Sequence, residues 1–391
     1  MKRFLALIFI VGLLVGSITL VLVKPQKVAD KGSASVTWLA DNNQANSDGF
    51  KRVFGPSEIV FPRDLGSHDD YQTEWWYYTG NLETSTGRPF GFQLTIFRRG
   101  LTPSIQPVST DNRSDWRTNQ VYFAHFTISD IANKAFYPAE RFSRGAAGLA
   151  GAQAVPYRVW LQDWSFTEIA PGQVRLVGKT DQVALDLVVK ETLPPILQGD
   201  RGYSAKSSEP GNASYYYSIV HQETTGKVTV KGETFEVTGL TWKDHEYSTS
   251  SLSADDVGWD WFSLQLDNDT ELMLFLVRRK DGSIESVSSG SFITADGTVQ
   301  PLNNTDWQLE VLDTWKSPTS KAEYPAKWRI AIPKLALNLE GQPLMPNQEL
   351  NLSTTYWEGA VNFKGTQAGK PVQARGYVEM TGYTNTLADV L

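Results

Sequence analysis

The segment "TWKDHEYSTSSLSADDVGWDWFSLQL", residues 241–266, gathers groups that exchange protons beside large aromatic rings. His245, one of four histidines in the chain, stands between Asp244 and Glu246, and Tyr247 follows. In an apolar site the pKa of such groups moves toward neutrality, which suits general acid and base catalysis. Aromatic faces attract a cation that forms beside them. The segment is therefore suited to moving protons on an apolar substrate.

Asp260 is the most informative residue of this segment, because a charged side chain is not expected on the apolar face of a strand. "WDWFSLQL" has the period of two that a β-strand produces. Asp260 falls on the apolar face and the tryptophans fall on the other; the apolar neighbours are Phe262, Leu264 and Leu266, and the tryptophans are Trp259 and Trp261. An unpaired buried aspartate is costly, so Asp260 pairs with a buried cation, stays neutral as an acid, or faces a ligand cavity. We expect His245 to be the partner of Asp260 in a functional site. The alternative is that the same His–Asp pair is purely structural and ties the two domains together at their junction.

Glu74 is the second carboxyl group that we expect inside the fold. It precedes four aromatic residues in "TEWWYYTGNL", and alternation along a strand places Glu74, Trp76 and Tyr78 on one face. A carboxyl group that shares a barrel interior with aromatic rings is desolvated, which raises its pKa. The alternative is an ion pair with Arg98 or Arg99, with the aromatic residues as simple core.

Two further histidines lie in strand-like segments and are candidates to line a cavity. His125 alternates with Val121 and Phe123, and His221 follows the tyrosine-rich "YYYSIV". For each, the alternative is an ordinary core histidine. Four scattered histidines and no cysteine predict that the protein has no metal site. The sequence lacks the glycine-rich motifs of nucleotide cofactors, so we expect no cofactor.

The periodicity of two continues from residue 56 onward, and no segment carries a long helical stripe. This pattern predicts an all-β fold of antiparallel sandwiches or barrels. A chain of 391 residues exceeds what one hydrophobic core usually serves, and the polar run "STSSLSADD" marks a boundary. We therefore expect two domains, residues 56–250 and 251–391. The net charge of −7 argues against nucleic acid as a partner.

The first 55 residues differ from the rest of the chain. Lys2 and Arg3 precede an uncharged run over residues 4–23, which is long enough to span a bilayer as a helix. We interpret residues 1–25 as an uncleaved membrane anchor or a signal peptide, and residues 26–55 as a polar tether. Positive charge on the short N-terminal side predicts that the body is exported. The expected location is the periplasm, either free or anchored to the inner membrane.

Six motifs together resemble the AttH/carotenoid 1,2-hydratase family. They are "TEWWYYTGNL", "GFQLTIFRR", "GLTWKDHEYS", "GWDWFSLQLDNDTELMLFLVRR", "YWEGAV" and "GYVEMTGY", which occur in this order between residues 65 and 383. The resemblance implies two tandem lipocalin-like β-barrels after the N-terminal hydrophobic helix. It also implies an exported protein that is associated with an ABC transporter.

The activity that the resemblance implies is acid-catalysed hydration. Carotenoid hydratases add water across an isoprenoid double bond without a cofactor, and family hydratases are thought to use an acid and a histidine beside aromatic residues. In this chain the resemblance implies that Asp260 donates the proton and that His245 orients Asp260 or activates water. Glu74 would be the reserve acid. Tyr247 departs from the family, where many relatives have tryptophan, so the resemblance implies no particular substrate.

Two functions follow from these observations. The first is a membrane-tethered protein that holds an apolar or amphipathic ligand, such as a lipid, in a lipocalin-like cavity. The second is a cofactor-free hydratase or isomerase that acts on an isoprenoid- or polyketide-like substrate. A purely structural envelope protein would leave Asp260 unexplained. The residues expected to line the ligand site are Trp76, Tyr78, Asp244, Glu246, Tyr247, Trp259, Trp261, His125 and His221.

Overall fold

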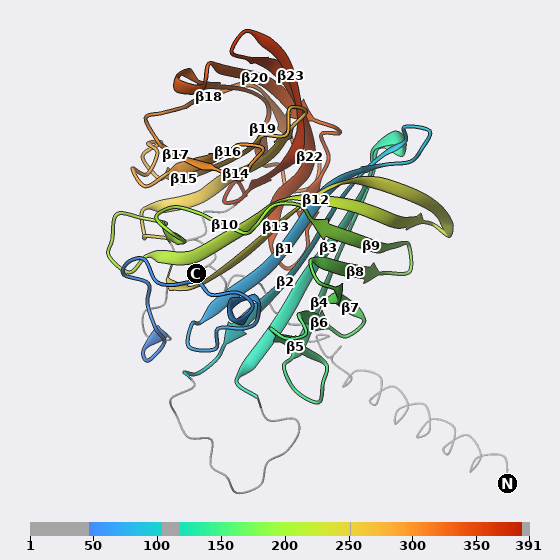
Figure 1. Ribbon diagram of the computed structural model, residues 1–391, viewed down its shortest axis with the longest axis vertical. Helices are drawn as coiled ribbons and strands as arrows, with labels where there is room; N and C mark the ends of the chain where they lie inside the picture. Colours follow the sequence, from blue (N-terminus) through green and yellow to red (C-terminus); the bar gives the residue numbers. More distant parts are fainter. Residues whose placement is uncertain (1–46, 104–117, 251, 385–391) are drawn as a thin grey trace, which may run out of the picture. The chain divides into compact units, whose positions relative to one another are not determined.

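The computed structural model describes residues 47–103, 118–250 and 252–384, which are built almost wholly from antiparallel strands in two sheets (Figure 1). The predicted all-β fold with two tandem lipocalin-like domains is confirmed. The predicted anchor and most of the tether lie outside the described residues. Among the described residues, no helix is long and apolar enough to cross a membrane.

The first sheet runs from the start of the described strands to Ser250. Its strands pair in the order β4-β3-β2-β1-β13-β12-β9-β8-β7-β6-β5, and β10 and β11 pair with β12. Strand β6 also contacts β2, β3 and β4, so the sheet curls back toward its own edge. The bounds are β1 (Thr73–Glu83), β2 (Pro89–Gly100), β3 (Gln120–Asp130), β4 (Ala135–Arg144), β5 (Ala150–Gln153), β6 (Arg158–Leu161), β7 (Trp164–Ala170), β8 (Gln173–Lys179), β9 (Val183–Glu191), β10 (Ile196–Leu197), β11 (Tyr203–Ala205), β12 (Ala213–Val230) and β13 (Glu233–Ser250).

The second sheet begins at the next strand, after the polar run around residue 251. Its order is β17-β16-β15-β14-β23-β22-β20-β19-β18, with β21 paired to β22. The bounds are β14 (Asp256–Leu266), β15 (Glu271–Arg279), β16 (Ser289–Ile293), β17 (Val299–Asn303), β18 (Gln308–Lys316), β19 (Glu323–Ile332), β20 (Leu337–Pro343), β21 (Glu349–Asn351), β22 (Thr355–Gln367) and β23 (Lys370–Met380). Both sheets belong to one compact unit.

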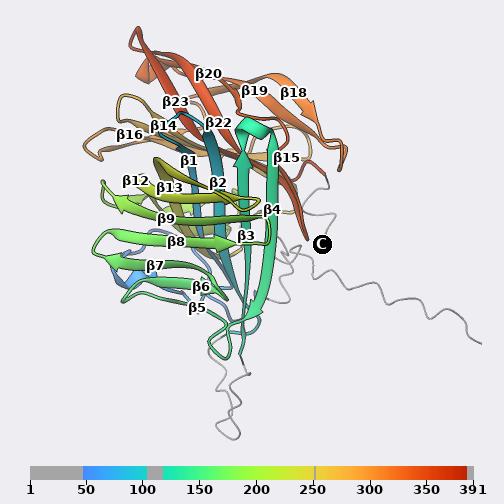
Figure 2. The same ribbon diagram turned by 90° about the vertical axis from the view of Figure 1, so that its right-hand side faces the viewer.

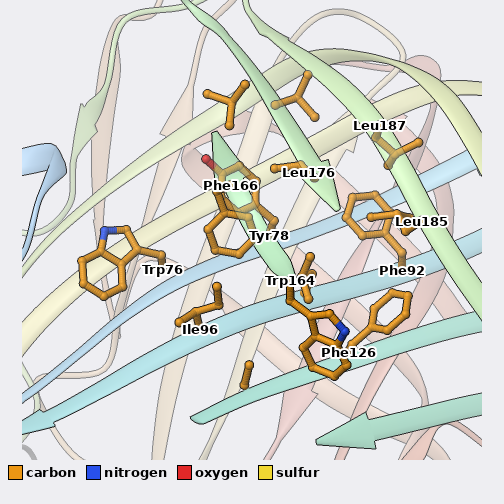
Figure 3. Packing of buried hydrophobic residues seen from close by; sticks show 14 of the residues in the cluster. Trp76, Tyr78, Phe92, Ile96, Phe126, Trp164, Phe166, Leu176, Leu185 and Leu187 are labelled. Atoms are coloured by element: carbon orange, nitrogen blue, oxygen red, sulfur yellow. The ribbon is translucent and has the colours of Figure 1, made fainter. Parts of the chain in front are cut away.

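Each sheet has an inner face that encloses its own apolar core. In the first sheet, Trp76 and Tyr78 of β1 belong to the same cluster of buried residues as Phe166 of β7 and Leu185 of β9 (Figure 3). The rings of Tyr78 and Phe166 lie 4.6 Å apart. In the second sheet, Phe262, Leu264 and Leu266 lie in the corresponding core. The alternation predicted for β1 and β14 is therefore confirmed.

The outer faces of the two sheets pack against each other, and this contact carries many polar groups. A third cluster joins Tyr77 of β1 and Tyr216 of β12 to Trp261 of β14 and Tyr377 of β23. β1 contacts β23 and β2 contacts β22, and Figure 2 shows these strands close together where the sheets meet. Alternation in the central strands thus assigns each side chain either to a core or to the contact between the sheets.

Two positions of strand β7 should contribute very differently to the stability of the protein, because only one of them lies in the inner core. Phe166 is fully buried in the first core, whereas Ile169 is 52% exposed. We expect Phe166→Ala to lower the free energy of unfolding by about 3–5 kcal/mol, because it removes buried apolar surface and leaves a cavity. Ile169→Ala should change it by less than about 0.5 kcal/mol. Chemical denaturation followed by tryptophan fluorescence checks both, and equal losses in the two variants would contradict the assignment of faces.

Candidate active site at the contact between the sheets

The predicted site residues separate into three places, and the first is the inner face of the first sheet. Glu74 of β1 and His245 of β13 meet there, with His245 Nε2 2.8 Å from Glu74 Oε1. Arg98 of β2 donates from Nε to Glu74 Oε2 at 2.8 Å, which is the alternative predicted for Glu74. His68, which precedes β1, places Nδ1 2.7 Å from Glu74 Oε1. We call His68, Glu74, His245 and Arg98 the inner cluster.

The charges of the inner cluster keep its carboxyl group ionised. Burial alone would raise the pKa of Glu74, but Arg98 and His68 hold it well below its usual value. Burial likewise opposes the charge on His68, yet Glu74 and Asp64 raise its pKa to about 9. Burial lowers the pKa of His245 to about 4. Glu74 is therefore a poor proton donor at neutral pH.

Asp260 occupies a second place, inside the second sheet. It is 4% exposed and on the apolar face, as predicted, but its carboxylate accepts from Arg278 Nε at 3.2 Å and from the Tyr383 hydroxyl at 3.1 Å. The predicted pairing of Asp260 with His245 is wrong, because β14 opens a new sheet and Asp260 faces that sheet's own core. Burial raises the pKa of Asp260, while Arg278 opposes this rise.

The third place is the contact between the sheets, where carboxyl groups from both sheets gather. Glu358 of β22 and Glu379 of β23 are direct cross-strand partners. The Tyr77 hydroxyl donates to Glu358 Oε1 at 2.6 Å across the contact. On the first sheet, Asp244 of β13 is paired in register with Tyr77 of β1. We call Asp244, Glu246, Glu358 and Glu379 the contact cluster.

The hydrogen bonds of the contact cluster come mainly from uncharged donors. Asp244 Oδ1 accepts from Ser218 Oγ at 2.5 Å and from Trp242 Nε1 at 2.8 Å. Glu379 Oε2 accepts from Trp259 Nε1 at 3.1 Å. Among the described residues, Glu358 Oε2 has no hydrogen-bond partner. These carboxyl groups lack the guanidinium partner that Glu74 has.

Glu246 is the exception, because it has a cationic partner. Its Oε1 lies 2.7 Å from Lys206 Nζ and also accepts from Ser214 Oγ. The ammonium group of Lys206 lies 4.2 Å from the ring centre of Phe275 in the second sheet. Within the part of the chain that the structure describes, no cation forms an ion pair with the other three carboxyl groups of the cluster.

The surroundings of the contact cluster favour protonated carboxyl groups near neutral pH. Burial raises the pKa of Asp244 to about 7, and burial together with Glu246 and Asp244 raises that of Glu379 to about 7. Burial and the nearby Glu379 raise the pKa of Glu358 well above its usual value. Carboxyl groups that share a site cannot all ionise at once, so the cluster holds at least one exchangeable proton at pH 7.

Aromatic rings from both sheets surround these acids. Trp261 Nε1 donates to the Tyr216 hydroxyl at 3.2 Å, and the rings of Trp261 and Tyr77 meet edge to face at 5.3 Å. Trp259 and Glu379 are partly exposed, so this edge of the cluster meets solvent. The arrangement combines an apolar, aromatic surface with acids that hold a proton, which is what protonation of an alkene or a hydroxyl group requires.

The remaining predicted residues divide between these places. Trp76 and Tyr78 lie in the core of the first sheet. Tyr247 is the cross-strand partner of Glu74 and stacks on His68 with ring centres 3.5 Å apart. His125 and His221 lie at the contact between the sheets and bind Tyr356 and Glu271: His125 Nδ1 is 2.7 Å from the Tyr356 hydroxyl and His221 Nδ1 is 2.6 Å from Glu271 Oε1. Asp244, Glu246, Trp259 and Trp261 lie together, and Glu74 and His245 lie together.

Sequence reasoning missed Glu358, Glu379 and His68. The two glutamates stand in "YWEGAV" and "GYVEM", which were noted as motifs, but their pairing depends on the register between β22 and β23. His68 stands in a polar loop, where no periodic signal distinguishes it from solvent-facing residues. Glu358 did carry a signal in the sequence, because it follows Tyr356 and Trp357 in a strand-like segment. A charged residue is rarely buried without a partner, so a glutamate in such a segment is a candidate for a functional role.

Comparisons with known proteins agree with this fold and with the noted motifs. Residues 52–383 match the AttH-like family model. A crystal structure of a candidate AttH protein from Nitrosomonas europaea is 33% identical, covers 86% of this chain and 100% of that chain, and superposes with a TM-score of 0.74. The structure of kievitone hydratase from Nectria haematococca shares the fold at 16% identity, covering 86% of this chain and 98% of that one with a TM-score of 0.63.

Two curated fungal proteins are also similar in sequence. Dehydratase asqC of Emericella nidulans is 21% identical over 321 residues, which cover 73% of this chain and 88% of that protein. Kievitone hydratase of Fusarium solani subsp. phaseoli is 26% identical over 185 residues, which cover 44% of this chain and half of that protein. The relatives thus include proteins named for adding and for removing water.

The raised pKa of Asp244 predicts a distinctive dependence of stability on pH. The folded protein keeps a proton on Asp244 that the unfolded chain releases above the ordinary pKa of 3.8. Because the folded state binds this proton more tightly, the proton stabilises the fold at low pH, and the stabilisation is lost as pH rises through about 7. Asp244→Asn stays neutral at every pH. Its free energy of unfolding should therefore rise relative to the wild type between pH 5 and 8, by on the order of a few kcal/mol.

Denaturant titrations at a series of pH values test this expectation. The exposed Asp181 provides a matched control, and Asp181→Asn should give a curve parallel to that of the wild type. If Asp244→Asn also runs parallel to the wild type, the carboxyl group of Asp244 is ionised in the folded protein and the prediction fails.

Proposed function

We propose that this chain, which belongs to the AttH-like family, is a hydro-lyase that adds water to, or removes water from, an apolar unsaturated substrate. The observation that carries the proposal is the contact cluster, in which carboxyl groups of both sheets have their pKa raised toward neutrality beside aromatic rings. The names of the two fungal relatives, a dehydratase and a hydratase, support the same reaction class.

The chemistry follows from two carboxyl groups in different protonation states. Glu379 is partly exposed and has a pKa of about 7, so it reaches a substrate and donates a proton to one carbon of a double bond. The other carbon becomes cationic, and the faces of Trp259 and Trp261 stabilise it. Water attacks this carbon and loses a proton to Asp244, whose pKa of about 7 leaves its carboxyl group ionised in part of the molecules at neutral pH.

The protons balance over one turnover. Glu379 ends the reaction ionised and Asp244 ends it protonated, so one proton must leave Asp244 and one must return to Glu379. Glu379 is partly exposed and takes its proton from solvent, which also receives the proton that Asp244 releases. The net reaction adds one water molecule to the double bond, and the reverse sequence removes it.

Export through residues 1–25, a periplasmic location and an ABC transporter partner would supply such an enzyme with envelope lipids of isoprenoid or polyketide character. The competing function is to bind an apolar ligand without changing it. A binding protein would use the same aromatic surface at the contact but would leave the mass of its ligand unchanged.

The test is turnover of an envelope lipid extract in ¹⁸O-labelled water, followed by mass spectrometry. The wild type should yield products that carry one labelled water, whereas Glu379→Gln and Asp244→Asn should lower the rate by about 10²–10⁴-fold, because each loses a proton-transferring group. Glu236, an exposed residue of β13, supplies the control: Glu236→Gln should keep the wild-type rate. Wild-type turnover in both acid variants, or a retained ligand without labelled product, would overturn the assignment.

A further inference from the structure

Lys243 of β13 is a buried cation that the proposed hydration chemistry does not use. It is 1% exposed, and its ammonium nitrogen lies 4.5 Å from the ring centre of Tyr157 and 5.7 Å from those of Tyr78 and Tyr217. Among the described residues, no carboxylate lies within ion-pair distance of this nitrogen. Burial lowers the pKa of Lys243 to about 8, and the more distant charge of Glu191 only partly opposes this. The fold therefore buries this cation without an anion beside it.

Gln222 of β12 is a second buried side chain that lacks a partner. It is fully buried, and neither atom of its amide group has a hydrogen-bond partner among the described residues. Val228 lies six residues further along β12 in the first core, and the register with β13 is unbroken between them, so Gln222 points to the same inner face. Gln222 is paired with Thr241, which precedes Lys243 by two residues. Gln222 and Lys243 are therefore diagonal neighbours on one wall of the core.

The hydrogen-bonding groups on this wall include more donors than acceptors. The ammonium group of Lys243 has three N–H donors, and the amide of Gln222 has two N–H donors and one acceptor oxygen. The hydroxyl oxygens of Tyr78 and Tyr157 lie 3.4 Å apart; one hydroxyl donates to the other, so one proton of this pair remains available. An excess of buried donors around a cation favours an anion with several lone pairs. We call Lys243, Gln222, Tyr78 and Tyr157 the lysine site.

We propose that the lysine site binds the carboxylate group of an apolar carboxylic acid inside the first sheet. The two carboxylate oxygens accept from the ammonium, amide and hydroxyl donors, and one negative charge balances that of Lys243. A phosphate monoester carries more negative charge than one ammonium group balances. Water could satisfy the amide of Gln222, but it supplies no charge to Lys243.

The side chains around the lysine site suit the hydrocarbon part of such an acid. They belong to the first core, in which the ring of Phe166 lies 4.6 Å from that of Tyr78 (Figure 3). Lys243 lies on the face of β13 opposite to Asp244 and Glu246 of the contact cluster, because side chains alternate along a strand. The acid is therefore not the substrate of the proposed hydration, and the two proposals stand or fall independently.

The segment that precedes β1 covers the lysine site on one side. The Tyr217 hydroxyl donates to the backbone carbonyl of Asp64 at 3.1 Å, and the Tyr217 ring meets that of Phe61 edge to face at 4.9 Å. Trp76 Nε1 donates to the backbone carbonyl of Leu65 at 3.1 Å. The acid enters when this segment moves aside and these contacts break.

The test uses the full chain after removal of bound lipid, with dodecanoate as the probe. Calorimetry at pH 7 should show one equivalent bound by the wild type, whereas dodecanol, which has the same chain without the charge, should bind at least about tenfold more weakly. Lys243→Met replaces the ammonium group with an apolar group of similar length, and Gln222→Leu keeps the ammonium group. Each variant loses a hydrogen bond to a charged group and should bind dodecanoate about tenfold more weakly or worse.

An exposed lysine supplies the matched control. Lys190 of β9 pairs with Glu223 on the surface, and Lys190→Met should keep the wild-type affinity; melting curves show that each variant is folded. Absence of dodecanoate binding by the folded wild type would overturn the proposal. So would equal affinity for dodecanol, which indicates apolar adsorption alone, or wild-type affinity in the folded Lys243→Met or Gln222→Leu variant. Tighter binding of dodecyl phosphate than of dodecanoate would overturn the assignment of a carboxylate.

Discussion

The hydrogen bond from the Tyr77 hydroxyl to Glu358, 2.6 Å long, joins the two sheets at the point where buried carboxyl groups of both meet. Packing these outer faces together removes water from acids that have uncharged donors as their partners. An ionised carboxylate without a cation is far more costly to bury than a neutral acid, so the pKa of these groups rises. The chemistry of the contact cluster therefore depends on how the sheets pack.

The inner cluster shows what happens when a cation is present. Glu74 is as buried as Glu358, yet Arg98 and His68 keep it ionised. Asp260 lies between these cases, since Arg278 pairs with it while burial still raises its pKa. Burial alone therefore does not decide the role of a carboxyl group in this fold. The charge of its partner decides whether the group keeps its proton or stays ionised near neutral pH.

Part of this organisation could be predicted from the sequence. Alternation along β1 and β14 assigned Glu74 and Asp260 to inner faces and Trp259 and Trp261 to the opposite face, because a strand has a strict period of two. Alternation does not say which strand lies opposite, so it could not exclude the pairing of Asp260 with His245. Register across β22 and β23 is likewise a tertiary property, and the adjacency of Glu358 and Glu379 depends on it.

Infrared spectroscopy of the carboxyl groups measures the protonation state of Glu358 in the contact cluster. Difference spectra of the full chain in D₂O near neutral pD, comparing the wild type with Glu358→Gln, should contain the carbonyl band of a protonated carboxylic acid that the variant lacks. This band should persist at neutral pD, because Glu358 remains protonated there. A difference spectrum that contains carboxylate bands alone would show instead that Glu358 is ionised and that burial at the contact between the sheets does not hold its proton.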